Sequence, residues 1–340
     1  MGLSIFSLRS VNLRSESLRL RLFKKKQRTP LFDPTIPLSI QRASLDTSGS
    51  RVPLAADQRI EPVLAGNVSG EWIKSRSNTG KEAVVLYVHG GAFVTGSCLS
   101  SRCMSVNLAK ATKLPVLSIN YRLAPEHPFP AALEDVIAAY RWLLASGIRP
   151  QELIMVGDSA GGNLVLAALL SLRDAGDLLP AATILLSPWI DLAATGRSFL
   201  ALADADPYLT PPFMQRAARQ YLGKVPPTLP LASPLYGDLR DLPPMFIQVG
   251  SDEILLDDSI RLAQRVNEVG GVVHLEVWQR MWHVWHYFVG AIPQGECSFA
   301  QINAFIHAVI EQNSQTYQLL GQVGSDSFLL GLEQTQLLRR

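Results

Sequence analysis

The chain has 340 residues, three cysteines and a formal net charge of +2 at pH 7. A charge so close to neutral predicts no nucleic-acid partner, and three cysteines without metal-ligand spacing predict reduced thiols in a cytoplasmic protein and no metal site. No run of about 18 apolar residues is present, so the sequence predicts no stable membrane insertion. The length suits one large domain that buries its core without disulfides.

The first thirty residues combine eight basic side chains with one acidic side chain and with interleaved apolar residues. Two interpretations are open: a cap helix whose arginines face solvent, or an amphipathic helix that lies on an anionic membrane surface. Leu18, Leu20 and Leu22 alternate with polar residues at period two rather than 3.6, which does not decide between them. We favour the first interpretation and expect residues 1–50 to form a cap segment over the site.

The remaining elements alternate in a way that predicts one sheet. Two strand-like segments, 60–64 and 70–75, come first and are expected to pair antiparallel. Further strands are expected near 83–88, 115–120, 152–156, 181–187, 244–249 and 272–278, with helices near 100–112, 130–146, 160–174, 255–269 and 296–313. Such alternation predicts right-handed crossovers and a mainly parallel α/β sheet flanked by helices.

The catalytic domain is expected to span residues 51–315. Within it, the Pro- and Ala-rich stretch from about 192 to 235 is too long for a simple loop, so we expect a lid insertion over the site. Residues 316–340 form a Gln- and Leu-rich tail to which the sequence assigns no function.

The apolar run 83–88 is followed at once by His89-Gly90-Gly91. Glycines directly after a strand let the backbone approach a ligand closely. In esterases, a loop of this kind supplies one half of the oxyanion hole. A plain turn with a buried histidine is the alternative, and the serine motif downstream makes it the weaker one.

That serine motif is Gly157-Asp158-Ser159-Ala160-Gly161, which lies between a strand-like run and a helix-like run. A strand that enters a helix through so short a turn must bend sharply, which favours glycine on either side of the serine. The turn leaves the serine hydroxyl accessible. The N-terminus of the following helix offers free N–H groups to a developing oxyanion.

A serine nucleophile needs a base and an orienting carboxylate, in the chain order serine, acid, histidine on such a sheet. Asp252 and Glu253 follow the strand near 244–249, and the residues alone do not choose between them. His283 and His286 follow the last strand. The catalytic groups are then expected at the carboxyl ends of the strands.

Together with the run Tyr121–Asp135, these motifs resemble the hormone-sensitive-lipase-like family of α/β-hydrolases, in its bacterial carboxylesterase branch. The resemblance covers roughly Ala43 to Gln312. When this sequence is aligned without gaps on the family's Asp-Pro-Leu-Arg-Asp loop, Glu253 takes the place of the first aspartate. The resemblance therefore implies Glu253 as the acid, in place of the usual aspartate. Met281-Trp282-His283 matches the family's histidine pattern and implies His283 as the base.

The resemblance also implies backbone donors at Gly91, Ala92 and Ala160, with Ala92 replacing a family glycine. The expected activity is a serine carboxylesterase that hydrolyses short-chain acyl esters of small molecules without a cofactor. Lactone or amide hydrolysis at the same site is the alternative, and a non-catalytic binding protein on the same fold is a third. A homodimer is compatible with all three.

Overall fold

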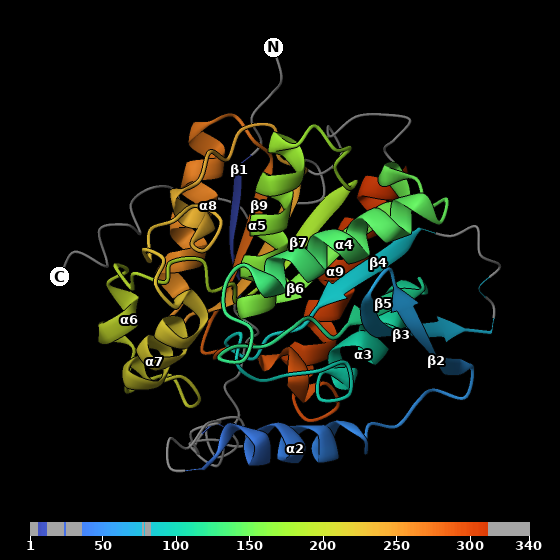
Figure 1. Ribbon diagram of the computed structural model, residues 1–340, viewed down its shortest axis with the longest axis horizontal. Helices are drawn as coiled ribbons and strands as arrows, with labels where there is room; N and C mark the ends of the chain where they lie inside the picture. Colours follow the sequence, from blue (N-terminus) through green and yellow to red (C-terminus); the bar gives the residue numbers. More distant parts are fainter. Residues whose placement is uncertain (1–5, 12–23, 25–35, 77, 79–82, 312–340) are drawn as a thin grey trace.

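The computed structural model describes residues 6–11, 24, 36–76, 78 and 83–311. Over these residues the chain forms a nine-stranded sheet with helices on both faces (Figure 1). The strands are β1 (Phe6–Val11), β2 (Gln58–Ala65), β3 (Val68–Ser75), β4 (Val84–Val88), β5 (Val116–Ile119), β6 (Leu153–Asp158), β7 (Ala182–Leu186), β8 (Met245–Gly250) and β9 (Val273–Trp278).

Five helices of the described chain lie near their predicted positions, and three further helices lie in the segments 1–50 and 192–235, where no individual helix was predicted. They are α2 (Leu38–Gly49), α3 (Arg102–Thr112), α4 (Ala131–Ala145), α5 (Ala160–Asp174), α6 (Ser198–Ala201), α7 (Pro211–Leu222), α8 (Leu256–Glu268) and α9 (Pro293–Glu311), with short 3₁₀ turns η1 (Pro150–Glu152), η2 (Pro234–Tyr236) and η3 (Trp285–Phe288). The strand order is β1-β9-β8-β7-β6-β4-β5-β3-β2. In this spatial order, each strand from β1 across the sheet to β5 is parallel to the next one. β3 runs antiparallel to both β5 and β2. The predicted, mainly parallel sheet is therefore confirmed.

The core lies on both faces of the sheet because successive side chains of a buried strand point to opposite sides. In β4, Leu86 packs in the cluster shared with α4, α5 and α8. Its neighbour Tyr87 packs in the cluster shared with α3 and α9. Since β4 is buried on both faces, its sequence is a continuous apolar run rather than an alternating one.

One segment differs from the expected cap. Residues 6–11 form β1, which pairs parallel with β9 at the edge of the sheet. Phe6 and Leu8 alternate with Ser7 and Arg9, a period-two pattern that suits a strand. The N-terminal segment therefore contributes to the sheet over these residues, and the expected arginine-rich helix lies outside the described residues, as does the 316–340 tail.

Helix α2, also within the segment 1–50, contacts the catalytic domain through Arg42. Arg42 donates to the carbonyl oxygens of Val94 and Ala124, at 2.8 and 2.9 Å, and pairs with Glu126. Figure 1 shows α2 across one end of the molecule, beneath α3. Helices α6 and α7 lie together at its left, in the segment that joins β7 to β8. That these two segments act as a cap and a lid stays a prediction.

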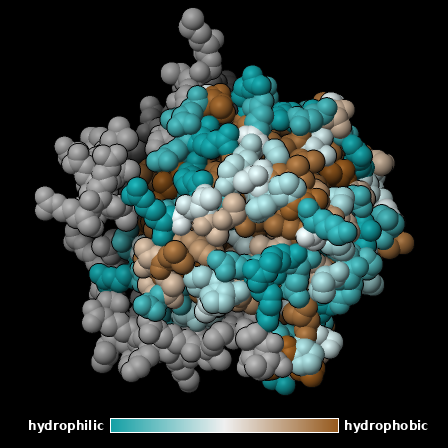
Figure 2. Space-filling view, turned by 60° about the vertical axis from the view of Figure 1, so that its left-hand side comes forward, coloured by the Kyte–Doolittle hydropathy of each residue, from teal (hydrophilic) through white to brown (hydrophobic). Residues whose placement is uncertain are grey.

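Among the described residues, no helix is long and apolar enough to cross a membrane. Large apolar side chains that are exposed come from separate elements, such as Leu64 of β2, Leu178 after α5 and Leu200 of α6. On the face in Figure 2, apolar side chains form patches that polar side chains interrupt.

The turn from β6 into α5 packs directly on the end of β4. A Cβ on Gly161 would lie 2.0 Å from the carbonyl oxygen of Val88, and a Cβ on Gly157 would lie 2.4 Å from the carbonyl oxygen of Gly161. Both distances are far below van der Waals contact, and the opposing atoms are backbone. Gly157 therefore lets the serine turn close on itself, and Gly161 lets the turn pack against the end of β4.

We expect Gly161→Ala to lower the free energy of unfolding by about 3 kcal/mol, because its new methyl group meets backbone that cannot move without shifting β4. Gly176→Ala is the control, since nothing lies within 4 Å of its Cβ, although its φ is +78°. The control should lose about 1 kcal/mol from backbone strain alone. Urea unfolding of both variants measures the difference, and equal losses would contradict this account of the turn.

Candidate active site

Ser159 occupies the turn between β6 and α5 with φ +53° and ψ −121°. This left-handed conformation is strained for any residue other than glycine. The turn is held by the Ser159 N–H, which donates to the carbonyl oxygen of Leu186 at 2.9 Å, and by its carbonyl oxygen, which accepts from Trp189 at 3.1 Å. The side chain is thereby fixed at the carboxyl end of β6, with 5% of the residue exposed.

Two further predicted residues meet Ser159 there. Nε2 of His283 lies 3.0 Å from Oγ of Ser159, and Nδ1 of His283 lies 3.2 Å from Oε2 of Glu253. Glu253 follows β8 and His283 follows β9, so three loops at the carboxyl ends of the parallel strands supply the three side chains. Glu253 is fully buried and His283 is 7% exposed.

The two alternative residues lie elsewhere. The Asp252 carboxylate is partly exposed, accepts from the hydroxyl of Ser251 at 2.8 Å and pairs with Lys24. His286 is buried, and its Nε2 lies 2.9 Å from Oε1 of Gln248. Neither side chain is hydrogen-bonded to Ser159 or His283 in the described part of the chain.

Burial sets the electrostatics of the pair. It raises the pKa of the Glu253 carboxyl, while the Ser187 hydroxyl and the Gly250 N–H, at 3.2 Å from Oε1, oppose that rise by stabilising the carboxylate. Burial also lowers the pKa of His283, which the nearby carboxylates of Asp206 and Asp158 partly offset. A lowered pKa keeps the imidazole neutral near pH 7, as a general base must be.

The loop after β4 lies against the serine turn, as a Cβ on Gly90 would be 3.1 Å from Cβ of Ser159. Gly91 and Ala92 have φ values of +119° and +54°. For the residues described, no hydrogen bond uses the N–H groups of Gly91, Ala92 or Ala160. Ala92 tolerates its left-handed backbone at a cost of about 1 kcal/mol, which accounts for glycine being usual at such a position.

Three polar residues of this site were not identified from the sequence. Oδ1 of Asp158 accepts from the Tyr87 hydroxyl at 2.6 Å and from the Gly90 N–H at 3.0 Å, so it ties the serine turn to the loop after β4. Ser187 accepts from the Val284 N–H at 3.2 Å. Asp206 lies in the irregular segment between β7 and β8, where no periodic pattern marks it. The position of Asp158 inside the serine motif was the one available signal.

The loop that carries His283 rests on buried aromatic rings. Trp282 packs edge-on against Phe288, with ring centroids 5.6 Å apart, and Trp285 packs at 5.6 Å against Trp278. Both indoles are fully buried. They therefore support the histidine loop from within the protein.

Comparison with known proteins agrees with this architecture. A family profile described as the alpha/beta hydrolase fold matches residues 85–287. An "Acetyl-hydrolase" of Streptomyces hygroscopicus is 43% identical over 244 residues, which is 72% of this chain and 81% of that protein. An "Esterase" of Acinetobacter venetianus is 35% identical over 285 residues, covering 84% of this chain and 93% of its own.

Solved structures give the same result. An esterase from the bacterial hormone-sensitive lipase family superposes with a TM-score of 0.82 at 42% identity, over 87% of this chain and 99% of its own. An esterase/lipase from an uncultured bacterium gives a TM-score of 0.81 at 39% identity over the same shares. The chain therefore belongs to the α/β-hydrolases, in the bacterial hormone-sensitive-lipase-like family, and is a carboxylic ester hydrolase.

Proposed function

We propose that this ester hydrolase uses Ser159 as nucleophile, His283 as general base and Glu253 as the orienting acid. The single observation that carries the proposal is the unbroken pair of hydrogen bonds, 3.0 Å from Ser159 to His283 and 3.2 Å from His283 to Glu253. An acid bound to Nδ1 fixes the tautomer that leaves Nε2 free to accept the serine proton.

In acylation, Oγ of Ser159 attacks the ester carbonyl carbon while His283 takes the serine proton. The carbonyl oxygen becomes an oxyanion, which the N–H groups of Gly91, Ala92 and Ala160 stabilise. The intermediate collapses when the C–O bond to the alcohol breaks and His283 returns its proton to the leaving oxygen. The alcohol departs, and an acyl ester on Ser159 remains.

In deacylation, water repeats the attack on that acyl ester. His283 takes one proton from the water, and the same N–H groups stabilise the second oxyanion. The bond to Oγ of Ser159 then breaks, the serine recovers the proton from His283, and the free acid leaves. Glu253 stabilises the imidazolium during both steps, and no proton needs to move to Glu253.

We further propose short acyl groups as the substrate class. Ser159 and His283 are almost completely buried, which supports a site that admits a small acyl group. The similarity to a protein named acetyl-hydrolase supports the same choice. The free thiols of Cys98, Cys103 and Cys297 support a cytoplasmic location. A homodimer stays a proposal, and the edge strands β1 and β2 are where a second sheet could pair.

Ser159→Ala should abolish turnover of p-nitrophenyl butyrate, because no other group can form the acyl ester. A fluorophosphonate should label Ser159 in the unaltered protein, as read by mass spectrometry of the modified peptide. The variant should keep its unfolding midpoint, which serves as the control for folding. Labelling of a different serine would transfer the nucleophile's role to that residue.

Glu253→Gln should lower kcat by roughly 10³–10⁴-fold, because a neutral amide no longer stabilises the imidazolium or selects its tautomer. Asp252→Asn is the matched control, since it makes the same change on the adjacent residue, and its kcat should stay within about threefold. Steady-state kinetics of both variants decide between the two acids. The reverse order of losses would make Asp252 the acid.

Among p-nitrophenyl esters, acyl chains of up to about six carbons should give the highest kcat/KM, because the proposed site admits a small acyl group. The series C2, C4, C6, C8 and C12, measured below the micellar concentration, tests this. A matching amide and a butyrolactone are run alongside as the competing substrate classes. Faster turnover of the C12 ester, the amide or the lactone than of the C4 ester would refute the substrate assignment.

A further inference from the structure

The loop that carries Glu253 is held from outside its own strand. Ile254 follows Glu253 directly, and both of its backbone polar groups bond to the segment between β7 and β8. Its N–H donates to Oδ2 of Asp206 at 3.1 Å, and its carbonyl oxygen accepts from Oγ of Ser198 at 2.8 Å. The backbone next to the proposed acid is therefore fixed by two side chains more than 45 residues earlier in the chain.

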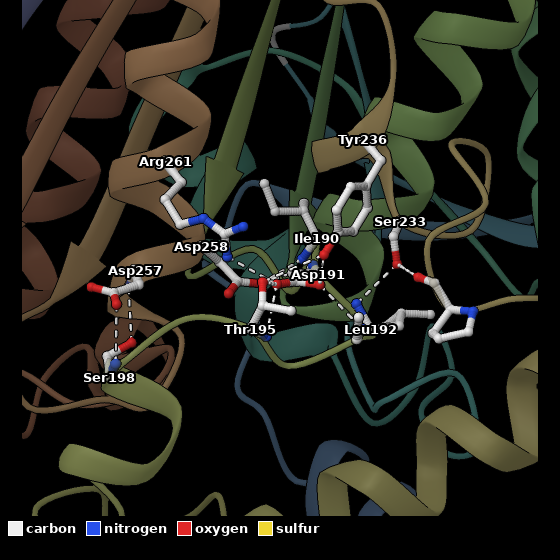
Figure 3. A network of polar contacts seen from close by, with 12 residues as sticks. Ile190, Asp191, Leu192, Thr195, Ser198, Ser233, Tyr236, Asp257, Asp258 and Arg261 are labelled. Carbon is white, nitrogen blue, oxygen red and sulfur yellow. Dashed lines mark hydrogen bonds and ion pairs between the residues drawn. The ribbon is translucent and has the colours of Figure 1, made fainter.

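The first turn of α8 strengthens this attachment. Asp257 accepts from the Ser198 N–H at 3.1 Å, and its own N–H donates to Oγ of Ser198 at 3.0 Å, a reciprocal pair that Figure 3 shows at the start of α6. Asp258 accepts from the N–H groups of Ile190 and Asp191, at 2.9 and 3.0 Å. The carboxylates of Asp257 and Asp258 thus both bind backbone N–H groups of the segment between β7 and β8.

A second set of contacts, in the centre of Figure 3, joins the same two parts of the chain. Asp191, whose side chain is fully buried, accepts from Arg261 of α8 at 2.9 Å and from the Tyr236 hydroxyl at 3.0 Å. It also accepts from the hydroxyl and the N–H of Thr195. The start of the segment is therefore firmly anchored, so its later residues can be placed accurately.

Asp206 is the residue of this segment whose carboxylate bonds to the backbone next to Glu253. It is 6% exposed, and its Oδ1 accepts from the N–H groups of Tyr208 and Leu209 at 2.9 and 3.0 Å. With Ile254, three backbone N–H groups bond to the carboxylate. Burial raises the pKa of Asp206, and the charge of His283 and the N–H bonds of Leu209 and Tyr208 oppose that rise by stabilising the carboxylate. The ring of Tyr208 stacks on Phe288 of the histidine loop, with centroids 6.0 Å apart. One turn therefore contacts both the acid loop and the histidine loop.

The charge of Asp206 also acts on His283. The titratable groups whose charges act on His283 or which bond to it are Glu253, Asp206, Asp158 and His286. Burial lowers the pKa of His283 and also that of His286, so His286 adds no positive charge near pH 7. The Asp206 carboxylate raises the pKa of His283 against that effect. It therefore favours the imidazolium that acylation and deacylation both require.

We propose that Asp206 is a positioning residue for ester hydrolysis: it fixes the backbone that carries Glu253, and the charge of its carboxylate acts on His283. The inference rests on the proposed roles of Ser159, His283 and Glu253. The segment between β7 and β8 would then help to position the acid and the base, in addition to any role as a lid over the site.

The test compares Asp206→Asn with Asp204→Asn and Ser198→Ala in the full chain. Asp206→Asn removes the charge and leaves at most one oxygen for the three N–H groups. Asp204→Asn makes the same charge change two residues away, at an exposed position. Ser198→Ala removes the bond to the Ile254 carbonyl without altering charge. Hydrolysis of p-nitrophenyl butyrate is measured from pH 2.5 to 9, because the pKa of His283 is lowered to about 4. kcat is expressed per serine that a fluorophosphonate labels.

Asp206→Asn should lower kcat roughly 10–100-fold with KM within about threefold, because a misplaced catalytic group mainly raises the barrier. Its acid limb of kcat/KM should move to lower pH by about 0.5–1 unit, since loss of a nearby carboxylate lowers the pKa of the base. Ser198→Ala should lower kcat severalfold, by about 5-fold, with an unmoved acid limb. Asp204→Asn should match the unaltered protein in both.

The acid limb does not depend on the amount of folded protein, so a partly unfolded Asp206→Asn still gives an answer. An unmoved limb, or a kcat equal to that of Asp204→Asn, would overturn the role of Asp206. If Asp206→Asn does not fold, a full kcat in Ser198→Ala overturns the support of Glu253 through Ile254, and a reduced kcat upholds it. Absence of labelling at Ser159 in the unaltered protein would instead overturn the proposed mechanism itself.

Discussion

The hydrogen bonds from His283 to Ser159 and to Glu253 join loops that follow three different strands, and most of the structure serves to bring those loops within 3.2 Å. β6, β8 and β9 are parallel, so their carboxyl ends meet at one edge of the sheet. Backbone contacts fix the loops further, because the Ser159 N–H bonds to the end of β7 and the Asp252 N–H bonds to the carbonyl oxygen of Met281, two residues before His283.

Burial keeps His283 neutral, as a base requires, but it also disfavours the charged forms of the acid and of the imidazolium. An imidazole and a carboxylate out of contact with water both favour their neutral forms, so the site needs compensating partners before charge can develop on His283. Glu253 has the Gly250 N–H and the Ser187 hydroxyl. Asp158 has the Tyr87 hydroxyl and the Gly90 N–H, and burial still raises its pKa to about 6. The groups that stabilise these two carboxylates also belong to the strands and loops that position the site. A change in the position of those loops would therefore also change the pKa values of the carboxyl groups near His283.

The sequence predicted what depends on local pattern. The parallel strands were predicted from their continuous apolar runs, and the serine turn was predicted from the glycines around Ser159. Both patterns lie within a few consecutive residues, so they can be recognised without knowing the fold. The choice of Glu253 over Asp252 required the resemblance to a family, since nothing local distinguishes two adjacent carboxylates on a loop. The strand Phe6–Val11 was missed because its pairing partner, β9, lies more than 260 residues away. Asp206 was missed for a different reason: its partners are backbone N–H groups, which no sequence pattern marks.

The segment between β7 and β8 illustrates why such residues escape a reading of motifs. Its contacts to the acid loop use a serine hydroxyl, a carboxylate and backbone groups, none of which has a distinctive spacing. Their effect comes from position, since they fix both backbone polar groups of Ile254, the residue next to Glu253. A segment attached in this way cannot move freely without also moving the acid. Substitutions that loosen its anchor at Asp191 and Arg261 should therefore affect catalysis as well as access to the site, although neither residue contacts Ser159 or His283 in the described structure.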